Sequence, residues 1–157
     1  MRAKFFVMAM AMLLVCSVGS IAAAQQQEQN TDTELQKFQG TWVMVSAEMD
    51  GKKVHDKHVK KSKLTFVGDK VEIIAPHQHK DKIVATITKF DLTKSPKEMH
   101  WVRSVGPKSG ADVIAIYEFD GPDQYKICFD PAGLKVPKKF STKAKTGHIC
   151  QTWKRVK

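Results

Sequence analysis

Hydrophobic and polar residues alternate along most of the chain after residue 40, with the two-residue period of strands that bury one face. Dipeptides that tolerate the positive φ angles of tight turns, Asp50-Gly51, Gly68-Asp69 and Asp120-Gly121, separate several of these runs. The pattern predicts eight strands, at residues 41–49, 63–67, 70–75, 82–91, 98–104, 112–120, 125–130 and 148–156. Residues 54–61 are expected to form one helical turn or a long loop.

Such a set of antiparallel strands either closes into a barrel or splits into two sheets, because an open sheet leaves strand edges unpaired. We expect closure, since Tyr125, Ile127 and Phe129 would all point inward from one strand and the residues between them outward. The sequence therefore predicts an all-β fold, an eight-stranded antiparallel up-and-down barrel.

A short helix is predicted before the first strand. Thr31 followed three residues later by Glu34 fits a capping box, and an apolar stripe then runs to Phe38. The Gln-rich residues 25–30 carry no apolar side chains and are expected to be a disordered leader. Residues 31–157 would then form one barrel domain.

The first 24 residues have the pattern of a secretory signal peptide. Arg2 and Lys4 precede an apolar run at residues 5–16, and three alanines at 22–24 offer a cleavage site. We therefore expect a secreted or periplasmic protein. A membrane-spanning helix is the alternative, but small polar residues dilute the segment. Lipid attachment at Cys16 is a third interpretation, in which Val15 takes the place of the usual small residue.

Cys128 and Cys150 remain after removal of this signal, an even number in an exported chain. Alternation places both on outward faces, and pairing them opposite each other makes residues 131–147, where Pro and Gly cluster, the connection between the last two strands. We predict a disulfide between them. Two buried thiols are the alternative.

Two positions near the ends of the domain resemble those of lipocalins. Gly40-Thr41-Trp42 resembles their Gly-x-Trp signature, and Arg155 is placed like the arginine that packs over that tryptophan. More specifically, LQKFQGTWVMVSAEMDGKK, LTFVGDKV, YEFDGPDQYKICFDPAGLKVPKKF and GHICQTWKRV resemble an uncharacterised family of secreted, lipocalin-like domains abundant in planctomycete bacteria. The resemblance implies a fold and a compartment, and no reaction or ligand.

Physical chemistry gives Trp42 and Arg155 the same interpretation independently. A tryptophan fills volume at one end of a small barrel, and a guanidinium stacked on its ring gains cation–π attraction. We therefore predict that Arg155 stacks on Trp42 at the closed end of the barrel. The alternative is that the two residues are unrelated.

The chain is basic, with a formal net charge of +10 over 157 residues, and the charge is clustered. One cluster between residues 131 and 147 contains no acid, and a second at residues 52–63 surrounds Asp56. The first consists of Lys135, Lys138, Lys139, Lys143 and Lys145. Such clusters attract polyanions, so anionic cell-surface polymers or lipid head groups are candidate partners. Nucleic acid is not expected, because no aromatic residues are placed for base stacking. A merely solvated surface is the alternative.

No catalytic motif is present: the sequence lacks Gly-x-Ser-x-Gly, His-Glu-x-x-His, a phosphate loop and Cys-x-x-Cys. We predict no enzyme, no catalytic residue and no cofactor; were there a base, His100 would be the candidate, although alternation places it outside. The pairs His77/His79 and His55/His58 lie in Lys-rich loops and are expected to be solvated, so no metal site is predicted.

Alternation directs many large side chains into the barrel. They are Trp42, Met44, Leu64, Phe66, Val71, Ile73, Ile83, Ile87, Met99, Trp101, Tyr117, Phe119, Ile127, Phe129 and Trp153. These residues either fill the interior or leave a cavity at the end away from Trp42. In the second case Trp101, Arg103 and Tyr117 would line it, and a monomeric protein would bind a small hydrophobic ligand there.

Overall fold

The computed structural model describes residues 28–74 and 82–157. The barrel strands are β1 (Gly40–Met49), β3 (Lys63–Val67), β4 (Lys70–Ile74), β5 (Ile83–Asp91), β6 (Lys97–Val105), β7 (Asp112–Phe119), β8 (Gln124–Phe129) and β9 (Ile149–Arg155). Within the described residues, every predicted strand is present, with its ends at most one residue from those predicted. Residue 75, the predicted end of the third strand, lies outside the described residues.

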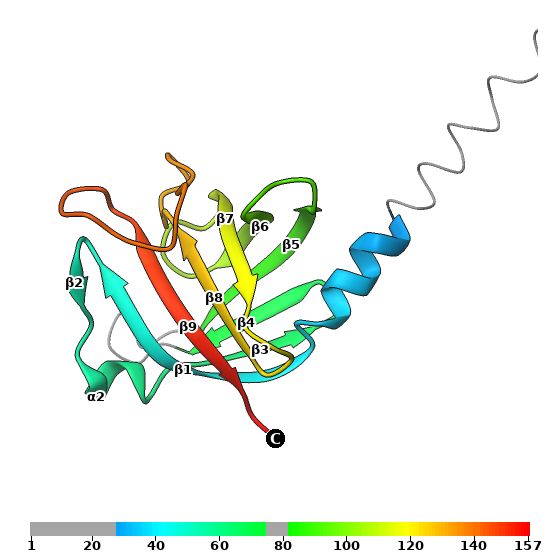
Figure 1. Cartoon of the computed structure of the whole chain (residues 1–157), viewed down its shortest axis with the longest axis horizontal. Helices are drawn as coiled ribbons and strands as arrows, with labels where there is room; N and C mark the ends of the chain where they lie inside the picture. Colours follow the sequence, from blue (N-terminus) through cyan, green and yellow to red (C-terminus); the bar gives the residue numbers. More distant parts are fainter. Residues whose placement is uncertain (1–27, 75–81) are drawn as a thin grey trace, which may run out of the picture. The chain divides into compact units, whose positions relative to one another are not determined.

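The strands form a closed, eight-stranded antiparallel barrel, as predicted (Figure 1). Neighbours in sequence pair with each other from β3 to β9, β1 pairs with β3, and β9 returns to pair with β1. A two-residue strand, β2 (Lys52–Lys53), pairs with the last residues of β1. The single helical turn α2 (Asp56–Val59) follows it, in the segment expected to hold a turn or a loop.

The chain divides into two compact units, residues up to Thr33 and residues 34–157. In the first unit, the described residues 28–33 are helical, and Thr33 Oγ1 donates a hydrogen bond to the Gln29 carbonyl (2.8 Å). The prediction of a disordered leader is therefore wrong for residues 28–30. Thr31 lies inside the helix rather than at its start. Helical backbone continues through residue 36 at the beginning of the second unit.

The two ends of the barrel are defined by β1 and β9. The closed end is where β1 begins and β9 ends, at the paired residues Trp42 and Arg155. The open end is where β1 ends and β9 begins, at the pair Met49 and Ile149. The connections at 106–111, between β6 and β7, and at 130–148, between β8 and β9, leave from the open end.

A disulfide joins Cys128 of β8 to Cys150 of β9, so the predicted bridge is confirmed. The two residues are direct cross-strand partners, with Cα atoms 4.1 Å apart. Both lie on the outer face, but Cys128 is fully buried, and so is its other cross-strand neighbour, Ile116. The outer face of the barrel is therefore covered at Cys128 and Ile116.

Register shifts interrupt the alternation in β1 and β5, and the one in β5 affects the core. In β5 the register shifts between Ile87 and Lys89, and both Ile87 and Phe90 are buried although they are three residues apart. An extra residue in a strand turns the following side chain to the opposite face. The bulge therefore adds Phe90 to the barrel interior, where strict alternation does not place it.

The closed end is filled by aromatic rings around Phe38, which is completely buried. Its ring centroid lies 4.7 Å from that of Phe119, and five aromatic rings surround it in all. The others are Phe66, Phe90, Tyr117 and Tyr125, at 5.2 to 5.7 Å. Tilted and edge-on aromatic contacts of this kind contribute beyond the area that they bury.

Candidate functional site

A cavity of about 310 Å³ lies at the open end, between the inner faces of the strands. Its lining residues are Met44, Ala47, Met49, Val54, Ile73, Ile83, Ala85, Trp101, Arg103, Pro107, Lys108, Phe129, Pro131, Ile149 and Gln151. Most of these described residues are apolar, and none of them is an acid. The small side chains of Ala47 and Ala85, both buried, leave the room that aromatic rings occupy at the closed end.

The aromatic wall of this cavity is formed by Trp101 and Phe129. Their rings meet edge to face, with centroids 5.2 Å apart. Trp101 is the cross-strand partner of Ile87 and Val113, and its inward direction follows from the alternation of β6. Because Trp101 lines the cavity, an apolar molecule bound there would change the environment of its ring.

Arg103 is the last inward-facing residue of β6 and is 8% exposed. One guanidinium nitrogen, Nη1, donates a hydrogen bond to the Pro107 carbonyl, while Nε is buried without any hydrogen-bond partner. No carboxylate among the described residues lies within ion-pair distance of it. Burial lowers the pKa of Arg103.

Tyr117 does not line this cavity, which corrects its predicted place. The β6–β7 register pairs it with Lys97 at the closed end, whereas Val113 pairs with Trp101 nearer the open end. Its hydroxyl donates a hydrogen bond to Glu34 Oε1 (2.9 Å). Burial, followed by the charge of Glu34 and this bond, raises the pKa of Tyr117. Alternation gives the face of a strand residue, but not its height along the barrel.

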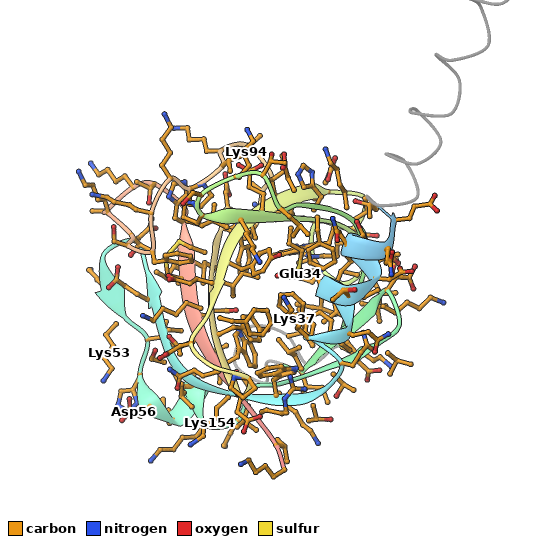
Figure 2. All side chains as sticks on the ribbon, turned by 45° about the vertical axis from the view of Figure 1, so that its right-hand side comes forward. Glu34, Lys37, Lys53, Asp56, Lys94 and Lys154 are labelled. Carbon is orange, nitrogen blue, oxygen red and sulfur yellow. A yellow bond between two sulfur atoms is a disulfide. The ribbon has the colours of Figure 1, made fainter. Side chains whose placement is uncertain are left out.

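Glu34 is a buried carboxylate that sequence reasoning assigned only to a capping box. It is 2% exposed and accepts hydrogen bonds from Lys37 Nζ (2.6 Å), Lys97 Nζ (3.0 Å) and the Tyr117 hydroxyl. Glu34 and Lys37 are labelled in Figure 2. Burial alone would raise the pKa of Glu34, but the three hydrogen bonds outweigh it and lower the pKa. The cluster ties the start of the domain to β6 and β7.

The predicted contact between Arg155 and Trp42 is present. The guanidinium carbon of Arg155 lies 4.2 Å from the centroid of the Trp42 ring. Arg155 also donates hydrogen bonds to the carbonyls of Lys37 (2.8 Å), Pro122 (3.1 Å) and Gln39. These carbonyls come from the two turns that border the closed end, so Arg155 closes this end while it stacks on Trp42.

A second hollow, a groove of about 940 Å³, lies along the closed-end turns. Its basic lining residues are Lys37, Lys94, Lys97, Lys138, Lys139 and Arg155, with Glu118 as the one acid and Phe140 among the apolar ones. Lys94, labelled in Figure 2, comes from the β5–β6 turn, while Lys138 and Lys139 come from the connection of β8 to β9. The sequence did not indicate that Lys94 belongs with these lysines.

The lysine loop, residues 131–147, is held against the end of β1. Thr142 donates two hydrogen bonds to Glu48, from its backbone nitrogen (2.9 Å) and its hydroxyl, and accepts one from the Gly51 nitrogen (2.7 Å). The Gly147 nitrogen donates to Asp50 Oδ1 (2.7 Å). These contacts place the two lysine-rich segments next to each other.

The five lysines predicted to form a cluster in this loop do not all line the same hollow. Lys135 and Lys143 line a smaller pocket of about 450 Å³ together with Lys138 and Lys139. Lys138 and Lys139 therefore line both this pocket and the groove at the closed end. Lys145 lines neither of them. The two hollows form one basic surface that follows the loop.

The histidines form no metal centre in the described ranges. His100 lies on the outer face of β6, as alternation predicts, with Nε2 3.9 Å from Glu98 Oε2. The His55 and His58 rings are 6.4 Å apart, and no group of three metal-ligating side chains occurs within residues 28–74 and 82–157. His77 and His79 lie outside the described residues.

No protein-family model matches this chain, and no curated protein or solved structure matches it. Within the part that the structure describes, no helix has the length and apolar character needed to cross a membrane.

Proposed function

We propose that the protein is an exported, lipocalin-like domain that binds a small apolar ligand in the open-end cavity. The observation that carries this proposal is the contrast between a filled closed end and an apolar hollow of about 310 Å³ at the open end. Protein interiors contain few voids larger than a water molecule, and ligand pockets begin at about 300 Å³. The cavity reaches the lower end of that range.

The lining supports an apolar ligand of modest size. Trp101 and Phe129 supply an aromatic wall, and Met44 and Met49 are flexible side chains that adapt to different shapes. Polar side chains are few, with Arg103 among them. A mainly apolar lining with a small number of placed polar groups is typical of small-molecule sites.

Titration with the neutral fluorescent probe 1-aminoanthracene tests the proposal. We expect saturable binding of one probe per chain, with the probe emission rising as it leaves water. Ala85→Phe adds a ring to the cavity wall and should abolish binding, whereas Val67→Phe adds a ring at an exposed position and should not. Absence of saturable binding to the wild-type protein would overturn the proposal. Solvent extraction of purified protein and mass spectrometry would identify a natural ligand.

Export is supported by the signal-like first 24 residues and by the Cys128–Cys150 bridge, because disulfides persist in oxidising compartments. We expect the exported chain to begin at Gln25 and to contain no free thiol at these two cysteines. Intact-mass measurement with and without reduction and alkylation checks both statements. A chain that begins at Cys16 with added lipid mass would contradict the first.

A second candidate function is binding of an anionic polymer in the groove at the closed end. Lys94, Lys138 and Lys139 come from two separate loops, line one groove, and make no ion pair with a carboxylate among the described residues. Phe140 adds an apolar contact beside them. Lysines without acidic partners in one hollow favour a ligand with several negative charges.

Retention on a dextran sulfate matrix tests this candidate. Lys138→Gln with Lys139→Gln should lower the salt concentration needed for elution more than Lys60→Gln with Lys61→Gln, which removes the same charge from an exposed part of the other lysine segment. Equal shifts for both pairs would indicate a response to net charge alone and would count against the groove. Binding to anionic vesicles but not to dextran sulfate would also overturn it.

A further inference from the structure

The guanidinium of Arg103 is the one buried basic group among the described residues that line the cavity. Its side chain comes from the inner face of β6, and the backbone around it is fixed by hydrogen bonds with the 106–111 connection. The Arg103 nitrogen donates to the Ala111 carbonyl (3.2 Å), and the Gly110 nitrogen donates to the Arg103 carbonyl (2.7 Å). These bonds fix the backbone of Arg103, and the bond from Nη1 to the Pro107 carbonyl holds the guanidinium itself.

Within residues 28–74 and 82–157, the hydrogen-bonding capacity of this guanidinium is mostly unused. A guanidinium has five N–H donors, and here one bond to the Pro107 carbonyl is formed while Nε is buried without a partner. A buried cation without a counter-charge is costly, and native structures normally pair it. None of the described residues that line the cavity is an acid that could do so.

The surroundings of Arg103 select one kind of partner. Trp101 lies two residues earlier on the same face of β6, and Ala85 is the cross-strand neighbour of Arg103, so its inner side borders apolar walls. Lys108, at the same rim, adds a second positive charge. A molecule that placed an apolar body between these walls would bring its end group to a positive, partly desolvated position.

We infer that Arg103 is the binding site for the anionic end group of the ligand, so that the cavity selects apolar molecules with one negative charge, such as alkyl carboxylates. This inference rests on the proposed function and names its ligand class. Guanidinium groups bind carboxylates with charge-assisted hydrogen bonds, which are stronger in a site from which water is excluded. Nε, which has no hydrogen-bond partner among the described residues, would donate one of them.

The alternative is that Arg103 only anchors the 106–111 connection through its bond to Pro107. That interpretation explains one nitrogen and leaves Nε without a partner. It also predicts a different experimental result. Loss of Arg103 would then lower stability but would not change the preference among ligands of different charge.

Displacement of 1-aminoanthracene by ligands with the same ten-carbon chain tests the inference. At neutral pH, decanoate should bind wild-type protein at least about tenfold more tightly than decanol, as expected for one hydrogen bond to a charged group. Decyltrimethylammonium should bind more weakly than decanol. Equal affinities for decanoate and decanol would overturn the inference while leaving the proposed function in place. Failure of the probe itself to bind would overturn the proposed function.

Variants assign the preference to Arg103. Arg103→Gln should reduce the ratio of decanoate affinity to decanol affinity to about one, and Arg103→Lys should restore part of this ratio. Lys108→Gln is the matched control, because it removes the same charge from the same cavity rim and should keep most of the preference. A larger loss in Lys108→Gln than in Arg103→Gln would overturn the assignment. The comparison of decanoate with decyltrimethylammonium in wild-type protein needs no variant and decides the matter if Arg103→Gln does not fold.

Discussion

The two ends of this barrel are built from the same strands but contain different side chains. At the closed end, Phe38 enters from the segment before β1 and packs among five aromatic rings. At the open end, the corresponding inward positions include Ala47 and Ala85, and a hollow of about 310 Å³ remains. The closed end is therefore densely packed, whereas the open end keeps an apolar hollow.

This division shows how a small barrel can be stable and still contain a cavity. A void costs free energy because its lining loses packing contacts. Here the dense aromatic packing around Phe38, the stacking of Arg155 on Trp42 and the buried Glu34 cluster all lie at one end. Because these contacts stabilise the closed end, the barrel can tolerate apolar side chains at the open end that border a hollow instead of packing against one another.

Replacing Trp42 with alanine should cause the largest loss of stability, because it removes a side chain from the packed closed end. The side chain is fully buried, its ring lies 4.8 Å from that of Tyr125, and its indole nitrogen donates to the Phe38 carbonyl. We expect a loss of about 3 to 5 kcal/mol in the free energy of unfolding, measured by denaturant titration. Met49→Ala, at a half-exposed open-end position, should cost less than about 1 kcal/mol. Similar costs for the two would show that the ends do not differ in stability.

Removal of the disulfide should give the next largest effect. Cys128 and Cys150 join β8 to β9 one residue pair before the open end and close a loop with a sequence separation of 22. Replacing both with alanine should lower the free energy of unfolding by about 3 kcal/mol, chiefly by freeing the unfolded chain. Thermal unfolding of the variant and of wild type under non-reducing conditions measures this. An unchanged midpoint would mean that the open end does not depend on the bridge.

A double-mutant cycle on Trp42 and Arg155 sharpens the comparison at the closed end. Arg155→Ala should destabilise less than Trp42→Ala, because Arg155 is partly exposed. The two substitutions should be non-additive by about 1 kcal/mol, since the guanidinium lies over the ring. Additive losses in denaturant titrations would contradict an energetic contribution of the stack.

Acid should weaken the closed end through Glu34, with the smallest effect of the series. Its pKa is lowered in the folded protein, so it stabilises the fold above the pKa of an unfolded glutamate, about 4.3, and this contribution disappears as the pH falls through the lower folded value. Glu34→Gln should therefore lose less stability than wild type between about pH 5 and pH 3. Parallel pH profiles of the two proteins would rule out this carboxylate as a source of the acid sensitivity. Asp120→Asn, in an exposed turn, is a control.

Much of the fold could be predicted from local sequence. The strand ends follow from alternation and from turn residues such as Gly68-Asp69, both of which act within a few residues. The Cys128–Cys150 bridge was predictable because the two cysteines share a face and the connection between their strands is marked by Pro and Gly. Trp42 and Arg155 were predicted as a pair for their place at the two ends of the domain.

Part of the candidate site could be predicted as well. Trp101 and Arg103 lie at the cavity because they are inward residues near the open end of β6. Tyr117 has the correct face but the wrong height, because its height depends on the register between β6 and β7. Phe90 points inward only because β5 contains a bulge, which alternation does not reveal.

The sequence by itself determined the strands, the faces of their side chains and the disulfide, because alternation and turn chemistry are local properties. Apart from the Cys128–Cys150 and Trp42–Arg155 pairs, only the tertiary structure decided which side chains meet. Glu34 lies 63 residues from Lys97 and 83 from Tyr117, yet it accepts hydrogen bonds from both. At the opposite end, Arg103 forms no ion pair with any carboxylate in the described part of the chain. The reason is that strand register and bulges, which set heights along the barrel, result from packing between segments distant in the chain.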